Sequence, residues 1–259
     1  MFTFLYSALL GFFEVFPLSA QGLDTALSAV LGETLPAVSS GWIFGTLLGT
    51  VAVFYRPLWR AAKGLCSIHK KFKWRKASGD QIMGIYAIIC ALPLLVMLFI
   101  LEELGIGAGL GFIGLMFLAS AALLFIGDHT VCRETPATEM TVTHCIKSAL
   151  FQAVALIPGL SRIGVTLGMA LNMGFRRRDA FDFAILLSVP ALLALGLWNL
   201  GGFAAGGWAV ALLSMAGAAV GAALGGLALR WLFKKDLLNI AVGLGLLAAA
   251  ATIIFSFVR

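Results

Sequence analysis

Charged residues are scarce in this sequence. They account for 12% of its 259 residues, whereas hydrophobic residues account for 61%, well above the roughly 45–50% typical of soluble domains. The mean hydropathy of +1.03 agrees with this balance. The composition predicts a single all-α, polytopic membrane domain over residues 1–259.

Cysteine pairs and a cleavable leader are also lacking. The four cysteines form no CxxC motif and follow no regular spacing, so no disulfide framework is implied. Cys132 and Cys145 lie near His129 and His144, but this spacing matches no structural zinc pattern. The first residues carry no basic n-region and no A-x-A cleavage pattern, so we expect them to stay in the mature fold.

The basic residues that are present cluster in the sequence. Eight of the 18 Lys and Arg residues fall between Arg56 and Lys76, and basic residues mark cytoplasmic loops. We therefore predict cytoplasmic loops at about 56–80 and 128–146. Residues 55–76 interleave cations with apolar side chains, which suits either a helix on the membrane surface or a positive-inside loop with aromatic anchors. The surface helix makes anionic membrane lipids the partner, and neither interpretation indicates a nucleic-acid site.

Two kinds of apolar segment alternate along the chain. Four runs are shorter than the roughly 20 residues of a spanning helix. They form two pairs, at about 3–16 with 23–31 and at 146–158 with 163–174, and a break separates the members of each pair. Each pair predicts a re-entrant hairpin, because irregular backbone at membrane depth must be buried in protein or line a cavity. Longer runs predict spans at about 38–55, 82–101, 108–127, 180–198, 204–229 and 237–257.

Each half of the chain thus holds one hairpin and three spans. A hairpin returns to its own side, whereas three spans end on the opposite side, so the second half must be inverted relative to the first. The charge distribution agrees, since the poorly charged turns then face outward. We predict an inverted-topology repeat, with repeat 1 at about 1–127 and repeat 2 at about 146–259.

The two breaks share a motif. LSAQG at 18–22 and LSRIG at 160–164 each follow a proline, and Ser19 and Ser161 are placed to cap the half-helix that begins after them. Pro158 and Gly159 interrupt the second hairpin. Helix N-termini carry free N–H groups and the positive end of the helix dipole, so two such ends near each other predict an anion site.

Arg162 is the charged residue of the second break. An arginine in apolar sequence costs about 2.5–3.5 kcal/mol at a helix centre, and its guanidinium suits phosphate oxygens; snorkelling to the interface is the alternative. Gln152 is a supporting residue or a polar residue in a packing seam. The predicted phosphate-binding residues are Gly22, Gly159, Ser161, Arg162, Gly164 and Thr166.

Glu14 is the acidic residue of the first apolar run. A carboxylate beside a phosphate repels it unless it holds a divalent cation or accepts a proton. We predict Glu14 as a metal ligand or general base, the alternative being a glutamate at the interfacial end of a half-helix.

QAVALIPGLSRIGVT at 152–166 and GFRRRDAFDFAILLSVP at 174–190 resemble the signature of the undecaprenyl pyrophosphate phosphatase family (BacA/UppP), Q-x-x-A-L-x-P-G-x-S-R-S-G-x-T followed by S-R-x-x-A-x-x-F-x-x-L-x-x-x-P. EVFPLSAQG at 14–22 is similar to that family's E-F-x-P-x-S-S-x-G, and 44–58 is similar to its next segment. The resemblance implies two re-entrant hairpins in an inverted repeat, and removal of one phosphate from a polyprenyl pyrophosphate. It also implies a divalent cation, Mg²⁺ or Ca²⁺, a bacterial inner (plasma) membrane location and a site open to the outer face.

Carried over by position, the resemblance makes Glu14, Ser19 and Arg162 catalytic. The sequence departs from the family pattern at the second acidic residue, the second serine, the histidine and the serine after S-R, which fall on Leu10, Ala20, Leu23 and Ile163. A late Y-R pair is absent from 239–249. The phosphate-binding half of the motif is therefore better kept than the half that activates a nucleophile.

Two functions follow from this mixture. The first is a phosphatase that hydrolyses undecaprenyl pyrophosphate and so recycles the carrier lipid of cell-wall synthesis. The second is a transporter or flippase for undecaprenyl phosphate or another anionic lipid, using the same site without cleavage. The expected partners are a polyprenyl pyrophosphate or phosphate lipid and anionic membrane lipids, with a homodimer left open.

Overall fold

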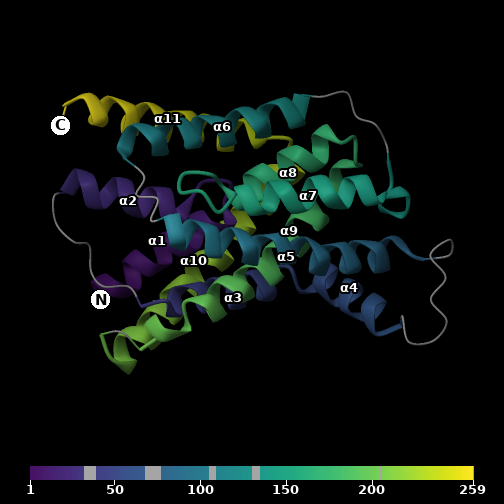
Figure 1. Cartoon of the computed structure of the whole chain (residues 1–259), viewed down its shortest axis with the longest axis horizontal. Helices are drawn as coiled ribbons and strands as arrows, with labels where there is room; N and C mark the ends of the chain where they lie inside the picture. The colour runs from purple at the N-terminus through teal and green to yellow at the C-terminus, as the bar shows by residue number, and fades with distance from the viewer. Residues whose placement is uncertain (32–38, 68–76, 105–108, 130–134, 205, 259) are drawn as a thin grey trace.

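The computed structural model describes residues 1–31, 39–67, 77–104, 109–129, 135–204 and 206–258. Within these ranges the chain is helical apart from its turns, and an isolated β-bridge joins Thr135 to Phe175. The predicted all-α class is confirmed (Figure 1). The helices are α1 (Phe2–Val15), α2 (Ala20–Leu31), α3 (Gly41–Val53), α4 (Tyr55–Ser67), α5 (Gly79–Leu104), α6 (Leu110–His129), η3 (Ala137–Glu139), α7 (Val142–Val154), α8 (Arg162–Asn172), α9 (Arg177–Trp198), η4 (Leu200–Gly202), α10 (Trp208–Lys234) and α11 (Leu238–Val258).

Five helices are long and apolar enough to cross a membrane, namely α5, α6, α9, α10 and α11. They match five of the six predicted spans. The sixth, at 38–55, is wrong in length, because α3 has 13 residues and reaches only about 20 Å at 1.5 Å per residue. It begins at Gly41, after two serines, and ends at Val53, because the backbone of the following Phe54 leaves the helical region with φ −106° and ψ 25°.

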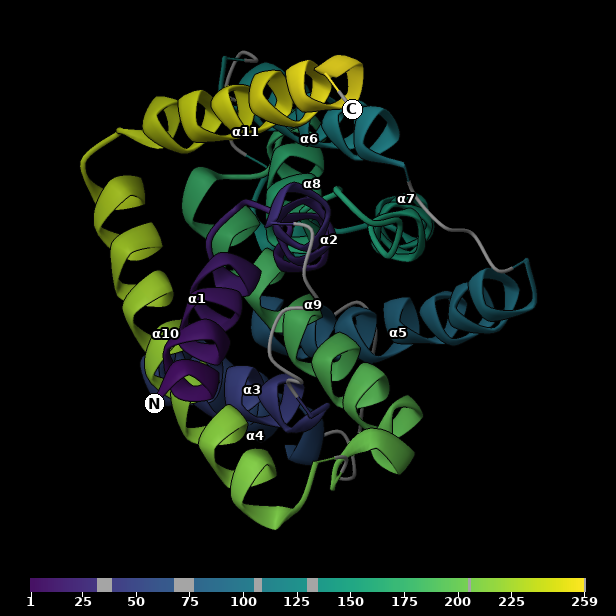
Figure 2. The same ribbon diagram turned by 90° about the vertical axis from the view of Figure 1, so that its left-hand side faces the viewer.

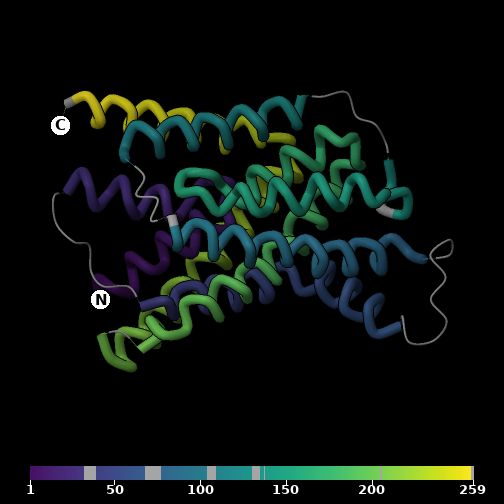
Figure 3. The backbone as a smooth tube through the Cα atoms, viewed as in Figure 1, coloured from purple at the N-terminus to yellow at the C-terminus, as the bar shows by residue number. Residues whose placement is uncertain are grey.

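The predicted hairpins are formed by α1 with α2 and by α7 with α8. The chain reverses between the members of each pair, as the tube in Figure 3 shows. The first hairpin opens toward the side where both chain termini lie, and the second opens toward the opposite side (Figure 1). In the end-on view, α2 and α8 lie near the centre, inside a surround that includes α5, α6, α10 and α11 (Figure 2).

Packing relates the two halves in a reciprocal way. The first helix of hairpin one, α1, packs on α10 of the second half, and the first helix of hairpin two, α7, packs on α5 of the first half. The last helices of the halves, α6 and α11, pack on each other. This pairing supports the inverted repeat, which stays a prediction.

A seam of glycines fixes α1 against α10. A Cβ atom at Gly221 would lie 1.8 Å from the backbone oxygen of Ala8, and Cβ atoms at Gly217 and Gly225 would lie 2.2 and 2.4 Å from backbone oxygens of α1. Glycines spaced four residues apart allow such backbone contact between membrane helices. The seam holds the whole of α1 in place, including Glu14 in its last turn.

The basic segment is helical from Tyr55 to Ser67. Ala61 of this helix is buried at 3% exposure, and a Cβ atom at Gly64 would lie 3.1 Å from the backbone nitrogen of Gln81 in α5. Accordingly, α4 runs beside the first turns of α5 (Figure 1). The rest of the predicted basic segment, at 68–76, lies outside the described residues, as does Cys132.

Candidate functional site

The tips of the two hairpins touch each other through glycines. A Cβ atom at Gly22 would lie 2.7 Å from the Cα of Gly159, which itself adopts a φ of +98°. Such a φ favours glycine, so both positions need a residue without a side chain. The Oγ of Ser19 accepts hydrogen bonds from the backbone N–H of Gly22 at 3.1 Å and from that of Gly159 at 3.3 Å. Ser19 therefore ties hairpin one to hairpin two.

Both half-helices begin with the same cap. The Oγ of Ser161 accepts from the N–H of Gly164 at 3.1 Å, as Ser19 does from Gly22 three residues ahead. The predicted caps are thus present, and they satisfy one of the free N–H groups at each helix start. The N–H groups of Gly22 and Gly164 are consequently engaged within the protein and are not free to bind an anion.

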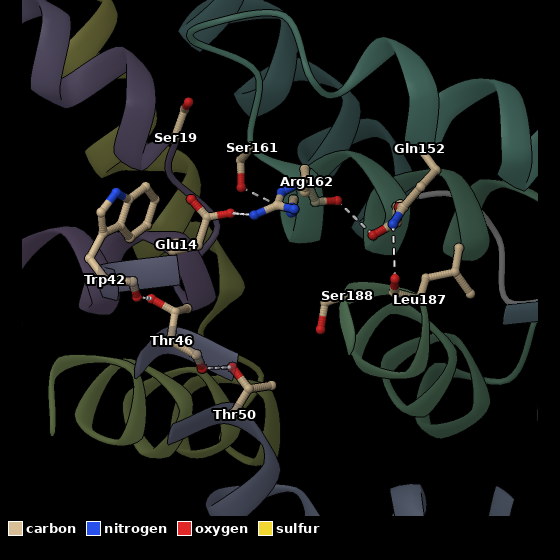
Figure 4. Close-up of polar contacts among 12 residues, drawn as sticks. Glu14, Ser19, Trp42, Thr46, Thr50, Gln152, Ser161, Arg162, Leu187 and Ser188 are labelled. Carbon is tan, nitrogen blue, oxygen red and sulfur yellow. Dashed lines mark hydrogen bonds and ion pairs between the residues drawn. The ribbon is translucent and has the colours of Figure 1, made fainter. Parts of the chain in front are cut away.

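Arg162 and Glu14 form a buried ion pair across the hairpins. The Nη2 of Arg162 donates to the Oε1 of Glu14 (Figure 4), and the two residues are only 8% and 9% exposed. The anionic partner that an arginine at this depth requires is therefore Glu14 itself. The structure brings together the two charged residues that the sequence places 148 positions apart.

One donor of Arg162 remains without a partner. Its Nη1 is buried and makes no hydrogen bond to any described residue. Leaving a buried charged donor unsatisfied is costly, roughly 1–3 kcal/mol or more. The unpaired Nη1 marks a position where a ligand oxygen would be stabilised.

Space beside the ion pair is limited. Glu14, Ser19 and Arg162 line a cavity of about 10 Å³, with Gln21 and Leu156 at its edge. That volume is close to the minimum for one water molecule, so a diphosphate enters only if side chains move or the ion pair parts.

A larger vestibule adjoins this cavity. It measures about 400 Å³ and shares Gln21 and Leu156 with the small cavity. Its mouth carries Glu102 and Trp198, whose indole N–H donates to the Glu102 carboxylate at 3.0 Å. The vestibule at the ends of α5 and α9 and the small cavity beside Arg162 are therefore neighbours, with Gln21 and Leu156 lining both.

The remaining predicted residues lie close by but engage other groups. Thr166 donates its hydroxyl to the backbone oxygen of Arg162 at 2.6 Å, one turn back in the same helix. Gln152 is 1% exposed and donates to the backbone oxygen of Leu187 in α9 at 2.9 Å, so it joins α7 to α9. Pro158 lines the vestibule. The structure brings together Glu14, Ser19, Ser161 and Arg162, and it directs Thr166 and Gln152 to backbone partners.

Ser120 is a site residue that the sequence patterns do not predict. Its Oγ, on α6, accepts from the backbone N–H of Ser161 at 2.8 Å, and so it holds the start of α8 from outside both hairpins. The available signal was a lone serine, 4% exposed in the fold, in an otherwise apolar span. Polar residues between membrane helices commonly hydrogen-bond across the interface.

The described residues contain no group of three or more His, Cys, Asp or Glu side chains close enough to hold a metal ion. Calcium takes six to eight oxygen ligands, whereas Mg²⁺ is commonly bound through one or two carboxylates together with substrate phosphates and water. Glu14 supplies one carboxylate here. The donor set fits a Mg²⁺ ion that arrives with a phosphate ligand, and it does not fit a cage made by the protein alone.

Comparison with known proteins places the chain. The profile of the family described as bacitracin resistance protein BacA matches residues 3–236. A protein named undecaprenyl-diphosphatase from Micrococcus luteus is 32% identical over 200 residues, covering 73% of this chain and 70% of the relative. Proteins of the same name from Alcanivorax borkumensis (32% identity; 68% and 74% covered) and Synechococcus sp. (28%; 86% and 81%) match as well. The chain, with its two hairpin tips joined at Arg162 and Glu14, belongs to the BacA family.

Proposed function

We propose that this protein is a membrane phosphatase that binds the diphosphate of a polyprenyl lipid at Arg162 and releases one phosphate. The observation that carries the proposal is the unpaired Nη1 of buried Arg162, placed where the two hairpin tips meet. Guanidinium groups bind phosphate oxygens through paired, charge-assisted hydrogen bonds. Relatives named undecaprenyl-diphosphatase support undecaprenyl pyrophosphate as the substrate.

Glu14 is the group that can activate water in this arrangement. A phosphate that binds Arg162 competes with Glu14 for the guanidinium and frees the carboxylate beside the terminal phosphorus. Glu14 then accepts a proton from water, whose oxygen attacks that phosphorus, and the P–O–P bond breaks. The products are the polyprenyl monophosphate and inorganic phosphate, and Arg162 stabilises the charge that develops on the phosphoryl oxygens.

Glu14 is the protein group that would hold a divalent cation at this site, together with oxygens of the lipid diphosphate and water, as is common for Mg²⁺. When bound, the cation would neutralise phosphate charge. The oxygen of Ser19 accepts two N–H groups, and its O–H stays available to donate. Ser19 therefore assists the reaction as a hydrogen-bond donor to the bound phosphate.

Access to the site runs through the vestibule, which we place on the outer face of the bacterial inner membrane. The support is its position at the end of α9 opposite the cluster of Arg177 and Arg178, because basic residues face the cytoplasm. The vestibule is lined by Leu98, Leu101 and Leu195 as well as Gln21, a combination that suits a lipid with a polar headgroup.

This orientation predicts opposite labelling of two cysteines. In intact spheroplasts, a membrane-impermeant maleimide should label the E102C/C66S/C132S variant, whereas the C132S variant, with exposed Cys66 on α4, should react only after permeabilisation. Cys90 and Cys145 are 0% and 5% exposed and serve as an unreactive background. Labelling of the C132S variant in intact spheroplasts, with labelling of E102C/C66S/C132S only after permeabilisation, would place the vestibule on the cytoplasmic face.

Transport without cleavage is the second candidate. It is favoured by the apolar residues Leu10, Ala20 and Leu23, which stand at positions where the family pattern has an acid, a serine and a histidine. The same Arg162 site then carries a lipid phosphate between leaflets. A transporter without phosphatase activity is expected to keep the phosphate-binding Arg162 and to lack the groups that activate a nucleophile.

Phosphate release separates the two. Purified protein with undecaprenyl pyrophosphate and Mg²⁺ should liberate inorganic phosphate, and omission of the metal should lower the rate. Protein that binds the lipid and releases none would overturn the phosphatase proposal. Lipid movement between leaflets of proteoliposomes, measured on the same preparation, would then support transport.

A further inference from the structure

A second charged cavity lies at the other end of α9. It has a volume of about 790 Å³ and is formed where α3 meets α4, at the start of α9 and at the end of α10. Arg178 lines it, whereas Trp198 of the same helix lines the vestibule, which puts the two about 30 Å apart at 1.5 Å per residue. This basic pocket is therefore separate from the Arg162 site.

Cations outnumber acids five to one in the lining of the basic pocket. They come from three elements distant in sequence, and one carboxylate, Asp182, faces them. Asp182 accepts from Arg60 at 2.8 Å and so neutralises that arginine. Within the described part of the chain, no ion pair joins Arg56, Arg230 or Lys234 to an acid. The cations are Arg56, Arg60, Arg178, Arg230 and Lys234.

Aromatic rings form the floor and rim of the same pocket. The ring of Phe181 packs on Phe54 at 5.7 Å and stacks on Phe233 at 4.5 Å between centroids, and these three rings line the cavity. Tyr55 and Trp59, 54% and 61% exposed, stand at the rim. Exposed tyrosine and tryptophan favour the headgroup level of a bilayer.

We propose that the basic pocket binds the phosphate headgroup of an anionic glycerophospholipid. The phosphate binds Arg56, Arg230 and Lys234, and the acyl chains leave over Tyr55 and Trp59. Basic pockets between membrane helices on the cytoplasmic side recognise such headgroups. An ordinary positive-inside surface would scatter its cations over the loops, whereas here cations from three chain segments line one cavity. The cavity also has apolar walls, which a lipid would contact and a free phosphate would not.

Lipid titration of the detergent-purified full chain, followed by native mass spectrometry, tests the proposal. The wild type should bind phosphatidylglycerol and not phosphatidylcholine. The R56Q/R230Q variant should bind phosphatidylglycerol roughly thirtyfold more weakly, from the loss of two cations near the lipid phosphate. The K147Q/K235Q variant removes the same charge outside the pocket lining and should bind it as the wild type does.

Three results would overturn the proposal. Equal weakening in both double variants would mean general attraction to a basic face. Equal binding of phosphatidylcholine would mean an apolar groove without headgroup recognition, and displacement of the lipid by millimolar inorganic phosphate would mean a free-phosphate site. Unfolding temperatures measured without lipid, expected to match within a few degrees, exclude loss of the fold as the cause.

Discussion

Replacing Arg162 with alanine should abolish lipid diphosphate hydrolysis and weaken lipid binding together. Arg162 is the buried cation at the meeting of the hairpins, and its free Nη1 is the donor that the ligand would satisfy. Loss of a preorganised donor for a developing anion costs about 10²–10³ in kcat, and the loss of ground-state binding adds to this. We expect kcat/KM for phosphate release to fall by at least about a thousandfold.

The fold must be checked in the same experiment. Removing Arg162 leaves Glu14 buried without its partner, and breaking a buried ion pair in this way costs about 3–5 kcal/mol of stability. R162K keeps the charge but loses the planar fork, so it should stay folded and lose about tenfold to a hundredfold in kcat/KM. R177A is a matched control, since Arg177 pairs with Asp128 and Asp236 away from the hairpin tips. Near-normal hydrolysis by a folded R162A protein would remove the phosphate clamp from the proposal.

Much of the fold follows from patterns within single segments. Length and apolar composition are enough to predict the five long helices, and the serine-to-glycine spacing predicts the caps at Ser19 and Ser161. The length of α3 could not be predicted in this way, because its apolar run continues through Phe54 although the backbone bends there. An apolar pattern shows which residues are apolar. It does not show where a helix ends when local backbone geometry sets that end and the sequence stays apolar across it.

The site itself depends on contacts between distant segments. The sequence predicts that Arg162 needs an anion and that Glu14 needs a cation or a proton, but it does not predict that each is the partner of the other. In the fold they satisfy each other. Their pairing depends on the glycine contact between the hairpin tips and on the seam between α1 and α10, neither of which a local pattern specifies. Ser120 could not be predicted for the same reason, since its partner is the backbone of Ser161.

The mutual ion pair gives the second large prediction, which concerns Glu14. Glutamine at this position keeps the shape and a carbonyl oxygen for Arg162 but removes the charge and the proton-accepting group. E14Q should lower kcat for phosphate release by about 10²–10⁴, the usual contribution of a general base. Measured without divalent cation, a lipid diphosphate analogue with a methylene bridge should bind E14Q as tightly as the wild type or more tightly, because Arg162 no longer has a competing carboxylate.

This divergence between turnover and binding distinguishes the roles that Glu14 can have. If Glu14 merely oriented Arg162, E14Q would lose analogue binding and phosphate release in parallel, because the position of the Arg162 guanidinium would be disturbed. A transporter would show no release from either protein, while the analogue would still bind. E139Q, a neutral substitution at an exposed position in η3, should change neither quantity. Only a hydrolase in which the phosphate displaces Glu14 from Arg162, and so frees the base for water, predicts lost turnover with retained or tighter binding.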